Sequence, residues 1–227
     1  MDILHSGLLK GRDPFYIRKL HIEDLEDILF VQKEVTQTLE NRNYLAPLTK
    51  DQYEHILLDG GSMVGVFADG RLVAFRATLI PGEDDEHLGH DIGLDALEHT
   101  SIIYQEISNV SPFYRGHRLQ NIMAKVLMEQ SRLSDFRYVC ATVAPFNIPS
   151  LKDKFAQQME IAALKRKYGG VLRYIFVKSL HEEGFNYEEE KVISMHDTVT
   201  QQTLLADGWR GTGMSDSPNG WFVHYRK

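Results

Sequence analysis

The chain has 227 residues, of which 43% are hydrophobic and 25% charged. These values are ordinary for a globular protein, so the chain can bury a core, and disorder over most of its length is excluded. The formal net charge of −7 argues against a broad nucleic-acid surface, because phosphate contacts need clustered Lys and Arg.

The compartment is inferred from the N-terminus and from the cysteine content. The early charges of MDILHSGLLKGRDPF do not resemble a signal peptide, and no apolar run approaches the roughly 20 residues that cross a bilayer. Cys140 is the one cysteine, which excludes an intrachain disulfide and suits a reducing compartment. We therefore expect a cytoplasmic protein with neither a membrane nor a nucleic acid as partner.

The first part of the chain predicts a strand followed by two helices. Residues 15–21 are typical of a short strand, and apolar residues at helical spacing predict a helix within 22–39. A second helix is expected over Lys50 to Leu58, capped by Thr49 and ended by Gly60-Gly61.

The middle of the chain predicts a hairpin, a loop, a strand and an amphipathic helix. The hairpin covers residues 63–80 and turns at Asp69-Gly70, a strong two-residue turn signal. Pro, Gly, Asp and His are frequent in residues 81–100, which we interpret as a loop. Residues 101–110 follow as a strand, and 119–133 have the apolar face of an amphipathic helix.

The last part of the chain continues the alternation of strands and helices. In order, the pattern predicts a strand at 136–144, a helix at 149–159, a strand at 172–180, a soft acidic segment at 181–191, a helix near 198–206 and a strand at 221–226 after Pro218-Asn219-Gly220. No internal repeat is found in the sequence. Interleaved helices together with an antiparallel hairpin favour an α/β protein with a mixed (α+β) sheet.

The segment from Val110 to Gln130 is the most informative. It predicts a strand, a tight turn and a helix, which together aim free backbone N–H groups and the helix dipole at one point. Arg115 and Arg118 add positive charge there, so an anion such as a pyrophosphate would be held well. An ordinary turn with exposed arginines fits the same residues, and local physics leaves the two interpretations equally open.

The same segment resembles the acetyl-CoA motif of the GCN5-related N-acetyltransferase (GNAT) superfamily. The pattern is V-x-P-x-x-R-G followed by an amphipathic helix, and the matching residues are Val110, Pro112, Arg115, Gly116 and Leu119. The resemblance implies that backbone amides of the turn hold the CoA pyrophosphate. It implies cofactor contacts for Ser108, Val110, Arg115, Gly116, His117, Arg118, Leu119 and Gln120.

Two positions depart from the family pattern. Arg118 and Gln120 stand where the family has small residues, mostly glycine, that let the phosphate approach closely. Further along the chain, Asn147 and Ser150 match residues that contact the pantetheine arm in the family. Asn147 could equally serve only as the cap of the helix that it precedes.

Amine acylation needs a base and no enzyme nucleophile, because the acyl-CoA supplies an activated carbonyl. Alternation along the strand predicts one face for Tyr104, Glu106, Ser108 and Val110. The family's placement of a base further back on this face nominates Glu106 as the catalytic base, with Tyr104 as its neighbour. The alternative is a strand glutamate that faces solvent or pairs with Lys or Arg.

The general acid and a covalent route are weighed next. The family's usual acid is a tyrosine in the helix after Asn147, where this chain has Lys154-Phe155. Tyr104, Tyr168 or water could substitute, or an acid could be dispensable because a thiolate leaves readily. Cys140 lies in an apolar strand and no G-x-S-x-G elbow is present, so direct transfer is favoured over a covalent intermediate.

Two polar clusters remain. His87, His90, Asp91 and His99 are metal-ligand types, but their spacing matches no known zinc motif, so we expect no metal and consider that the loop covers the acceptor. The run Lys165–Gly170 could contact the CoA 3′-phosphate or an acidic acceptor, but its composition favours a solvated turn between strands.

The sequence thus predicts a GNAT-like acyl-CoA N-acyltransferase fold in residues 1–180 and a C-terminal extension in 181–227. The extension would pack either on the core or on a second subunit, which would make a homodimer. The expected reaction moves an acetyl group from acetyl-CoA to a primary amine of a small molecule or peptide. A non-catalytic CoA or acyl-CoA sensor is the alternative, and a different nucleotide-binding α/β protein ranks last because G-x-G-x-x-G and G-x-x-x-x-G-K are absent.

Overall fold

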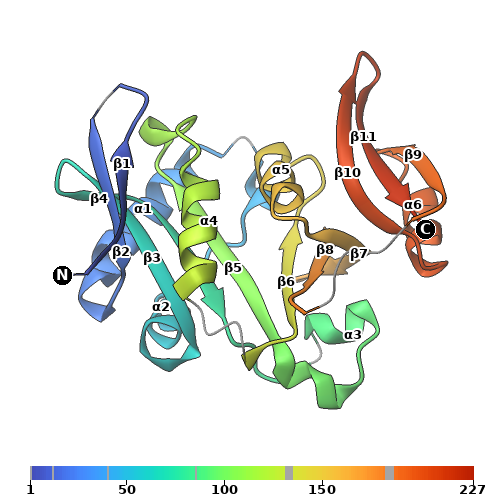
Figure 1. The fold of residues 1–227 in the computed structure, drawn as a ribbon, viewed down its shortest axis with the longest axis horizontal. Coiled ribbons are helices and arrows are strands. Elements are labelled where there is room, and N and C mark those ends of the chain that lie inside the picture. The colour runs from blue at the N-terminus through green and yellow to red at the C-terminus, as the bar shows by residue number, and fades with distance from the viewer. Residues whose placement is uncertain (1, 12, 40, 85, 131–134, 182–186) are drawn as a thin grey trace. The chain divides into compact units, whose positions relative to one another are not determined.

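A computed structural model describes the chain except for residues 1, 12, 40, 85, 131–134 and 182–186. The chain divides into two compact units (Figure 1). Unit 1 comprises Met1–Pro81 and Ile103–Asp135, and unit 2 comprises Gly82–Ile102 and Phe136–Lys227.

An antiparallel sheet forms the centre of unit 1. Its strand order is β1-β2-β3-β4-β5, and each strand is antiparallel to its neighbours. The strands are β1 (Ile3–Leu8), β2 (Pro14–Lys19), β3 (Gly61–Ala68), β4 (Arg71–Leu79) and β5 (Ile102–Val110). Asp69 and Gly70 both have positive φ between β3 and β4, as a two-residue hairpin turn requires, and the predicted hairpin is confirmed.

Helices cover both faces of this sheet. Helix α1 (Leu25–Gln37) and helix α2 (Lys50–His55), which continues into a π-helical turn, pack on one face, and helix α4 (Leu119–Gln130) packs on the other. Strand alternation separates the two cores, because Val64 and Val66 face α4 whereas Met63 and Phe67 face α1 and α2.

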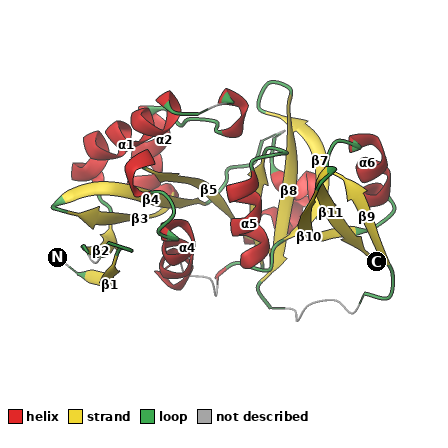
Figure 2. Ribbon diagram, turned by 90° about the horizontal axis from the view of Figure 1, so that it is seen from above, coloured by secondary structure: helices red, strands yellow, loops and turns green. Residues whose placement is uncertain are grey.

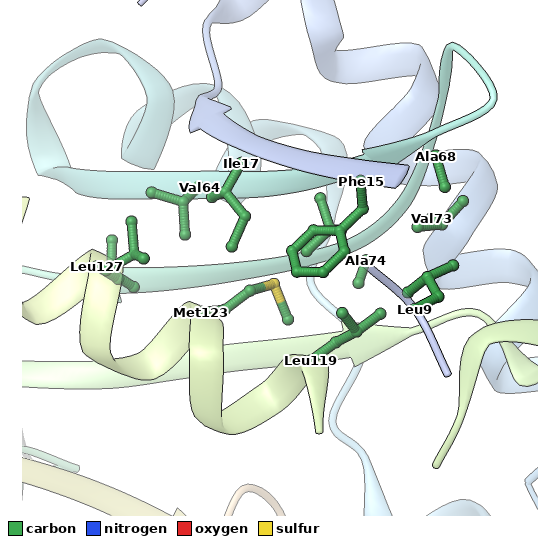
Figure 3. Close-up of a cluster of buried hydrophobic side chains, with 12 residues drawn as sticks. Leu9, Phe15, Ile17, Val64, Ala68, Val73, Ala74, Leu119, Met123 and Leu127 are labelled. Atoms are coloured by element: carbon green, nitrogen blue, oxygen red, sulfur yellow. The ribbon is translucent and has the colours of Figure 1, made fainter. Parts of the chain in front are cut away.

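The α4 side of the core joins residues that lie far apart in the sequence. Figure 3 shows Leu119, Met123 and Leu127 of α4 directed at Phe15 and Ile17 of β2. All of these side chains are buried. At about 25 cal/mol per Å² of apolar surface, such a face contributes most of the free energy that holds the helix on the sheet. The start of α4 is therefore fixed relative to β2.

Unit 2 contains antiparallel strands in the order β6-β8-β7-β10-β11-β9. Its elements (Figure 2) are α3 (Leu88–Ile92), β6 (Tyr138–Val143), α5 (Ile148–Ala156), β7 (Glu160–Lys167), β8 (Val171–Ser179), β9 (Glu190–Ser194), α6 (Thr198–Ala206), β10 (Arg210–Ser217) and β11 (Gly220–Arg226). Helix α3 contacts β7 and β8, and α6 contacts β7 and β10.

Unit 2 is built from two similar β-α-β-β segments, β6-α5-β7-β8 and β9-α6-β10-β11. Asn147 caps α5 by accepting from the Ser150 amide, and Asp197 caps α6 by accepting from the Thr200 amide. The strand after each helix carries an irregularity at the same relative position, as shown by register shifts at Ile161/Ala163 in β7 and Gly211/Gly213 in β10. The similarity of the two segments is thus one of structure, and the sequence shows no internal repeat that would have indicated it.

Several predicted elements differ from those observed. Residues 81–100 are not a plain loop, because they contain α3 and a 3₁₀ helix that begins at Ala96. Strands β1, β7, β9 and β10 were not predicted. The end of the predicted helix 119–133 lies outside the described residues, and so does part of the acidic segment. The division into a core at 1–180 and an extension at 181–227 stays a prediction. Within the described residues, no helix is long and apolar enough to cross a membrane.

Candidate functional site

The turn between β5 and α4 has the backbone conformation that an anion cradle needs. The chain leaves the ladder at Ser111, whose amide donates to the Val73 carbonyl, and Gly116 and Arg118 both take left-handed φ values of 82° and 60°. Beyond the turn, the Ile122 amide donates to the Arg118 carbonyl at 3.2 Å, which opens the hydrogen-bond pattern of α4. Helix-opening amides before it have no intrahelical partner, so they are donors for an anion.

Arg118 has a left-handed φ of 60°, a conformation that glycine adopts most readily. A non-glycine residue in the left-handed region costs roughly 1–2 kcal/mol, which the packing of α4 and β5 on either side must offset. Its side chain is exposed. Arg118 thus places an exposed cationic side chain beside the cradle, while its backbone takes a conformation that favours glycine.

The other cradle side chains have distinct partners. Arg115 is exposed and donates to the Thr38 hydroxyl at 3.3 Å, which holds the guanidinium beside the turn. The His117 imidazole instead accepts a hydrogen bond from the Lys10 amide at 3.0 Å. His117 therefore ties the cradle to the β1–β2 connection, and the positive charge beside the turn comes from the two arginines.

Val110 and Leu119 support the cradle from below. Val110 lies opposite Ala74 in the ladder and packs against the buried core, which includes Leu119. These two residues hold the last strand position and the first helix position on the same core. Their place in the family motif is explained by packing.

Arg76 of β4 is a residue of this region that sequence analysis missed. It is buried, with 1% of its surface exposed, and it donates to the Gln120 carbonyl at 3.2 Å and to the Gln105 side chain at 2.6 Å. It thereby joins the first turn of α4 to β4 and β5. The one signal in the sequence is an arginine within the otherwise apolar run LVAFRATLI.

Strand β5 contains a bulge at Glu106. Ile107 lies opposite Ala77, but Gln105 lies opposite the next residue, Thr78, so Glu106 is an extra residue in the ladder. A bulge bends the strand, leaves its extra residue unpaired and redirects side chains, and such bulges are frequent beside active sites.

The predicted common face of Tyr104, Glu106, Ser108 and Val110 is therefore wrong. Ser108 and Val110 lie on the α4 side together with Gln105, which contacts Met128 of α4. Tyr104 is buried and lies opposite Leu79, which belongs to the α1 and α2 side. The alternation fails because one additional residue shifts every side chain beyond it.

Glu106 has the electrostatics of a base that works near neutral pH. It is partly buried, and this burial raises the pKa of its carboxyl from 4.5 to about 6. The buried Tyr53 of α2 donates its hydroxyl to Gln32 at 2.6 Å. Burial, and then the charge of Glu106, raise the pKa of Tyr53, so this phenol stays protonated. Glu106 is thus the ionisable group of the pair.

Two polar side chains at the end of β5 are buried without a hydrogen-bond partner among the described residues. They are the Ser108 hydroxyl and both polar atoms of the Asn109 amide, whose residue is 1% exposed. An unsatisfied buried polar group costs roughly 1–3 kcal/mol. Such groups one and two residues before the end of a cradle strand are candidates for contacts with a ligand, and Asn109 was not predicted.

In unit 2, Asn147 acts as a helix cap. Its side chain accepts from the Ser150 amide at 3.4 Å, which satisfies a donor at the start of α5. This confirms the cap interpretation. A pantetheine contact of Asn147 and Ser150 stays a prediction.

Apart from Tyr104, the positions considered for an acid or a nucleophile are also in unit 2. Lys154 is buried and lies 3.4 Å from Asp153, and Phe155 packs edge-on against Phe176. Cys140 is buried, and this burial raises the pKa of its thiol, so it is a poor nucleophile. The hydroxyl of Tyr168, which is 45% exposed, lies 3.3 Å from Thr142.

The basic run is part of β7 and not of a turn. Lys165 and Lys167 pair with Asp91 at 3.0 and 2.8 Å, and Lys167 also pairs with Glu86 at 3.0 Å. Only Tyr168–Gly170 form the turn, where all three residues have positive φ. The lysines therefore hold the α3 segment against the sheet. The predicted turn between strands is confirmed at Tyr168–Gly170, and it is wrong for Lys165 and Lys167, which belong to β7.

Comparison of the sequence with protein-family models finds no match, and comparison with curated proteins finds none either. Solved structures do match. The GNAT domain of S. lividans PAT superposes with a TM-score of 0.56 and 16% identity, over 78% of this chain and 96% of that chain. The ribosomal-protein-S18-alanine N-acetyltransferase from Escherichia coli gives 0.55 and 13%, over 77% and 99%. Arabidopsis thaliana NAA60, solved with acetyl-CoA, gives 0.57 and 14%, over 74% and 99%.

The chain therefore has the mixed α/β fold of the GNAT acetyltransferases, as the motif predicted. Identities of this size establish the fold alone. Nearly all of each compared structure is covered but only about three quarters of this chain, so the chain carries residues beyond the shared fold.

Proposed function

We propose that this protein is an acetyl-CoA-dependent N-acetyltransferase that acts by direct transfer. The observation that carries the proposal is the β5–α4 turn, in which Gly116 and Arg118 take the left-handed conformations of an anion cradle. The GNAT fold supports it, since structures with this fold include one solved with acetyl-CoA.

The turn would bind the CoA pyrophosphate. Amides at the start of α4 donate to phosphate oxygens, and the helix dipole and Arg115 supply positive potential. Arg76 keeps these amides in place through the Gln120 carbonyl. Ser108, His117 and Leu119 are proposed to support the cofactor site. His117 and Leu119 do so by holding the turn, His117 through the Lys10 amide and Leu119 through the core.

The reaction requires one proton acceptor. A neutral amine nitrogen attacks the thioester carbonyl carbon, a C–N bond forms, the C–S bond breaks and CoA leaves as the thiolate. Glu106 takes the proton that the amine loses, directly or through water, and its pKa of about 6 makes it ionised at neutral pH. The bulge leaves Glu106 without a partner residue on β4, and a backbone N–H freed in this way would be suited to polarise the thioester carbonyl by donating to its oxygen.

The acceptor is proposed to be a primary amine of a small molecule or a peptide. The net charge of −7 favours a cationic acceptor over an acidic one. A homodimer, a cytoplasmic location and the absence of nucleic-acid or membrane partners remain predictions.

Calorimetric titration of the purified chain with acetyl-CoA tests the cradle. Arg115→Glu should weaken binding at least about tenfold, because it places a carboxylate beside the pyrophosphate. Arg71→Glu is the matched control, since Arg71 is exposed on β4 and the change in net charge is the same. Failure to bind acetyl-CoA, CoA or longer acyl-CoAs would overturn the proposal.

A sensor on the same fold is the second candidate. It is favoured by one observation, namely that α5 has the buried pair Asp153–Lys154 and Phe155 where the family has its usual tyrosine acid. Release of free thiol from acetyl-CoA in the presence of an amine panel separates the two. Turnover that disappears in Glu106→Gln supports the enzyme, and binding without turnover supports the sensor.

A further inference from the structure

Arg173 of β8 is a buried cation without a counter-charge among the described residues. It is 4% exposed, and the one hydrogen bond of its guanidinium within this part of the chain runs from Nη1 to the Leu172 carbonyl at 3.3 Å. The other buried cationic side chains of the described residues, Arg76, Lys154 and Lys167, each have a side-chain oxygen as partner. An uncompensated buried charge is unfavourable, so Arg173 calls for a partner from outside the chain.

The charges beside Arg173 leave one positive charge unmatched. Arg173 lies opposite Lys165 in the ladder, and Lys165 and Lys167 alternate onto the same face of β7. The two lysines pair with Asp91 and Glu86. Three cations thus face two carboxylates, a surplus of one positive charge. Burial lowers the pKa of the Arg173 guanidinium, as expected of a cation without a counter-charge.

Two hydroxyl groups lie on this face as well. Thr142 of β6 is opposite Ile175, which is two residues after Arg173 and therefore on the same side of the sheet. The hydroxyl of Tyr168 lies 3.3 Å from that of Thr142. After burial, the second cause that acts on the pKa of Arg173 is the charge of an ionised Tyr168, which raises it, so the phenol lies near the guanidinium. Tyr168 has a strained left-handed φ of 51°, and such strain is common at binding sites.

The guanidinium indicates the chemistry of the missing partner. Nη1 faces the Leu172 carbonyl, so the edge formed by Nε and Nη2 remains for a ligand. This edge presents two parallel N–H groups, whose spacing matches the two oxygens of a carboxylate. A carboxylate carries one negative charge and balances the surplus, whereas a phosphate ester carries up to two.

We propose that Arg173, together with the hydroxyls of Thr142 and Tyr168, binds the carboxylate of a small organic acid. The site stands apart from the proposed acetyl transfer, because it needs neither the cradle nor Glu106. The carboxylate can belong to the amine acceptor or to a separate ligand. An amino acid has no net charge, so the overall charge of −7 does not oppose its approach.

Arg173→Met tests whether the guanidinium is structural or reserved for a ligand. In a buffer without carboxylates or phosphate, urea unfolding of the full-length variant should give a midpoint at least as high as that of the parent, because an unpaired buried charge is lost. Arg166→Met, at an exposed arginine of β7, makes the same change of charge and is the matched control. A midpoint for Arg173→Met below that of the control would show that the guanidinium stabilises the fold, and would overturn the proposal.

Sodium acetate is the probe for the carboxylate, with NaCl at equal ionic strength and acetamide as controls. Acetate should raise the melting temperature of the parent, and neither control should do so. In a ¹H–¹⁵N spectrum, the arginine Nε–H signal that is missing from Arg173→Met should shift with millimolar acetate. An unmoved signal would overturn the proposal, and so would a larger shift with inorganic phosphate than with acetate at the same concentration.

Paired amines identify the source of the carboxylate. Lysine and lysinamide are compared as acceptors in the acetyl-transfer assay. If the acceptor supplies the carboxylate, Arg173→Met should lower kcat/KM for lysine at least about tenfold and leave that for lysinamide unchanged. Equal values of parent and variant for both amines, together with the acetate shift, assign the site to a separate organic acid. The unfolding and spectroscopic measurements need no acetyl-CoA, so failure of the carboxylate site and failure of the proposed enzyme are told apart.

Discussion

The ring centroids of Phe146 and His196 lie 4.5 Å apart, and these two residues occupy equivalent positions in the two β-α-β-β segments of unit 2. The Phe146 amide also donates to the sulfur of Met195 at 3.3 Å. The loops that lead into α5 and α6 therefore meet each other. Strands β7 and β10 are adjacent and antiparallel, with the remaining strands in mirrored order on either side.

This arrangement is a local two-fold pseudosymmetry. Each helix contacts a strand of the other segment, since α6 packs on β7 and α5 packs on β10. The hairpin turns also correspond, because Gly170 and Gly220 have nearly equal φ values of 101° and 103°. The C-terminal segment thus completes a sheet with its equivalent, and both segments bury their apolar faces against each other.

Glu106→Gln should lower kcat/KM of the proposed acetyl transfer about 10²–10⁴-fold, as the loss of a general base does. A base acts in its ionised form, so the rate of the parent protein should fall as the pH drops through about 6. This acidic limb should be absent in the variant. The pH profile of kcat/KM checks this, and an unchanged limb in Glu106→Gln would show that another group acts as the base.

The same variant should change the pH dependence of stability. Burial raises the pKa of Glu106 from 4.5 to about 6, so the folded state binds this proton more tightly than the unfolded state does. The free energy of unfolding therefore falls as pH rises between these values, by at most about 2 kcal/mol. Glu106→Gln removes the carboxylate whose burial is unfavourable once it is ionised, so the variant should lose this pH dependence and become more stable than the parent at pH 8. Urea unfolding at pH 4 and pH 8 measures the difference.

Gly116→Ala and Arg118→Gly form a matched pair in the cradle. A Cβ at Gly116 meets nothing within 4 Å, so alanine should cost about 1–2 kcal/mol through its left-handed φ alone. Arg118→Gly removes the same kind of strain, while glycine adds roughly 0.5–1 kcal/mol of chain entropy, so stability should not fall. Urea unfolding checks both variants, and a Gly116→Ala protein as stable as the parent would contradict the argument.

Regular elements with a strong local signal could be predicted from the sequence. The Asp69-Gly70 hairpin and the start of α4 at Leu119 depend on turn chemistry and helical periodicity, which are local. Strand β7 was missed because Lys165 and Lys167 interrupt its apolar pattern, and their partners, Glu86 and Asp91, lie in a distant segment.

The details of the candidate site depend on contacts between elements. The bulge at Glu106 depends on the partner strand, because it arises where consecutive residues of β4, Ala77 and Thr78, pair with Ile107 and Gln105 and leave Glu106 unmatched. Arg76 becomes part of the site because the fold carries the Gln120 carbonyl to it. Likewise, His99 meets Glu83 only after α3 has formed between them. A sequence pattern holds no record of such pairings.

Arg76→Met should lower the free energy of unfolding by about 3 kcal/mol. The substitution removes the buried guanidinium and with it the hydrogen bonds to the Gln120 carbonyl and to the Gln105 side-chain oxygen, which both lose this donor. Methionine keeps most of the side-chain volume. The start of α4 would lose its tie to β4, so acetyl-CoA affinity should also fall. Arg71→Met, at an exposed position of the same strand, should stay within about 0.5 kcal/mol of the parent. Equal unfolding midpoints for the two variants would contradict the proposed role of Arg76.

The two segments of unit 2 share one buried hydrogen-bond centre, which a double-mutant cycle can measure. The Gln201 side-chain oxygen accepts from Tyr174 of β8 at 2.7 Å and from Tyr225 of β11 at 2.8 Å. Tyr174→Phe and Tyr225→Phe should each cost about 1 kcal/mol in urea unfolding, because one donor remains for Gln201. The double variant should cost more than their sum, since the buried oxygen then loses both donors. Tyr168→Phe, at an exposed hydroxyl, is the control, and additivity within about 0.3 kcal/mol would show that the two tyrosines act independently.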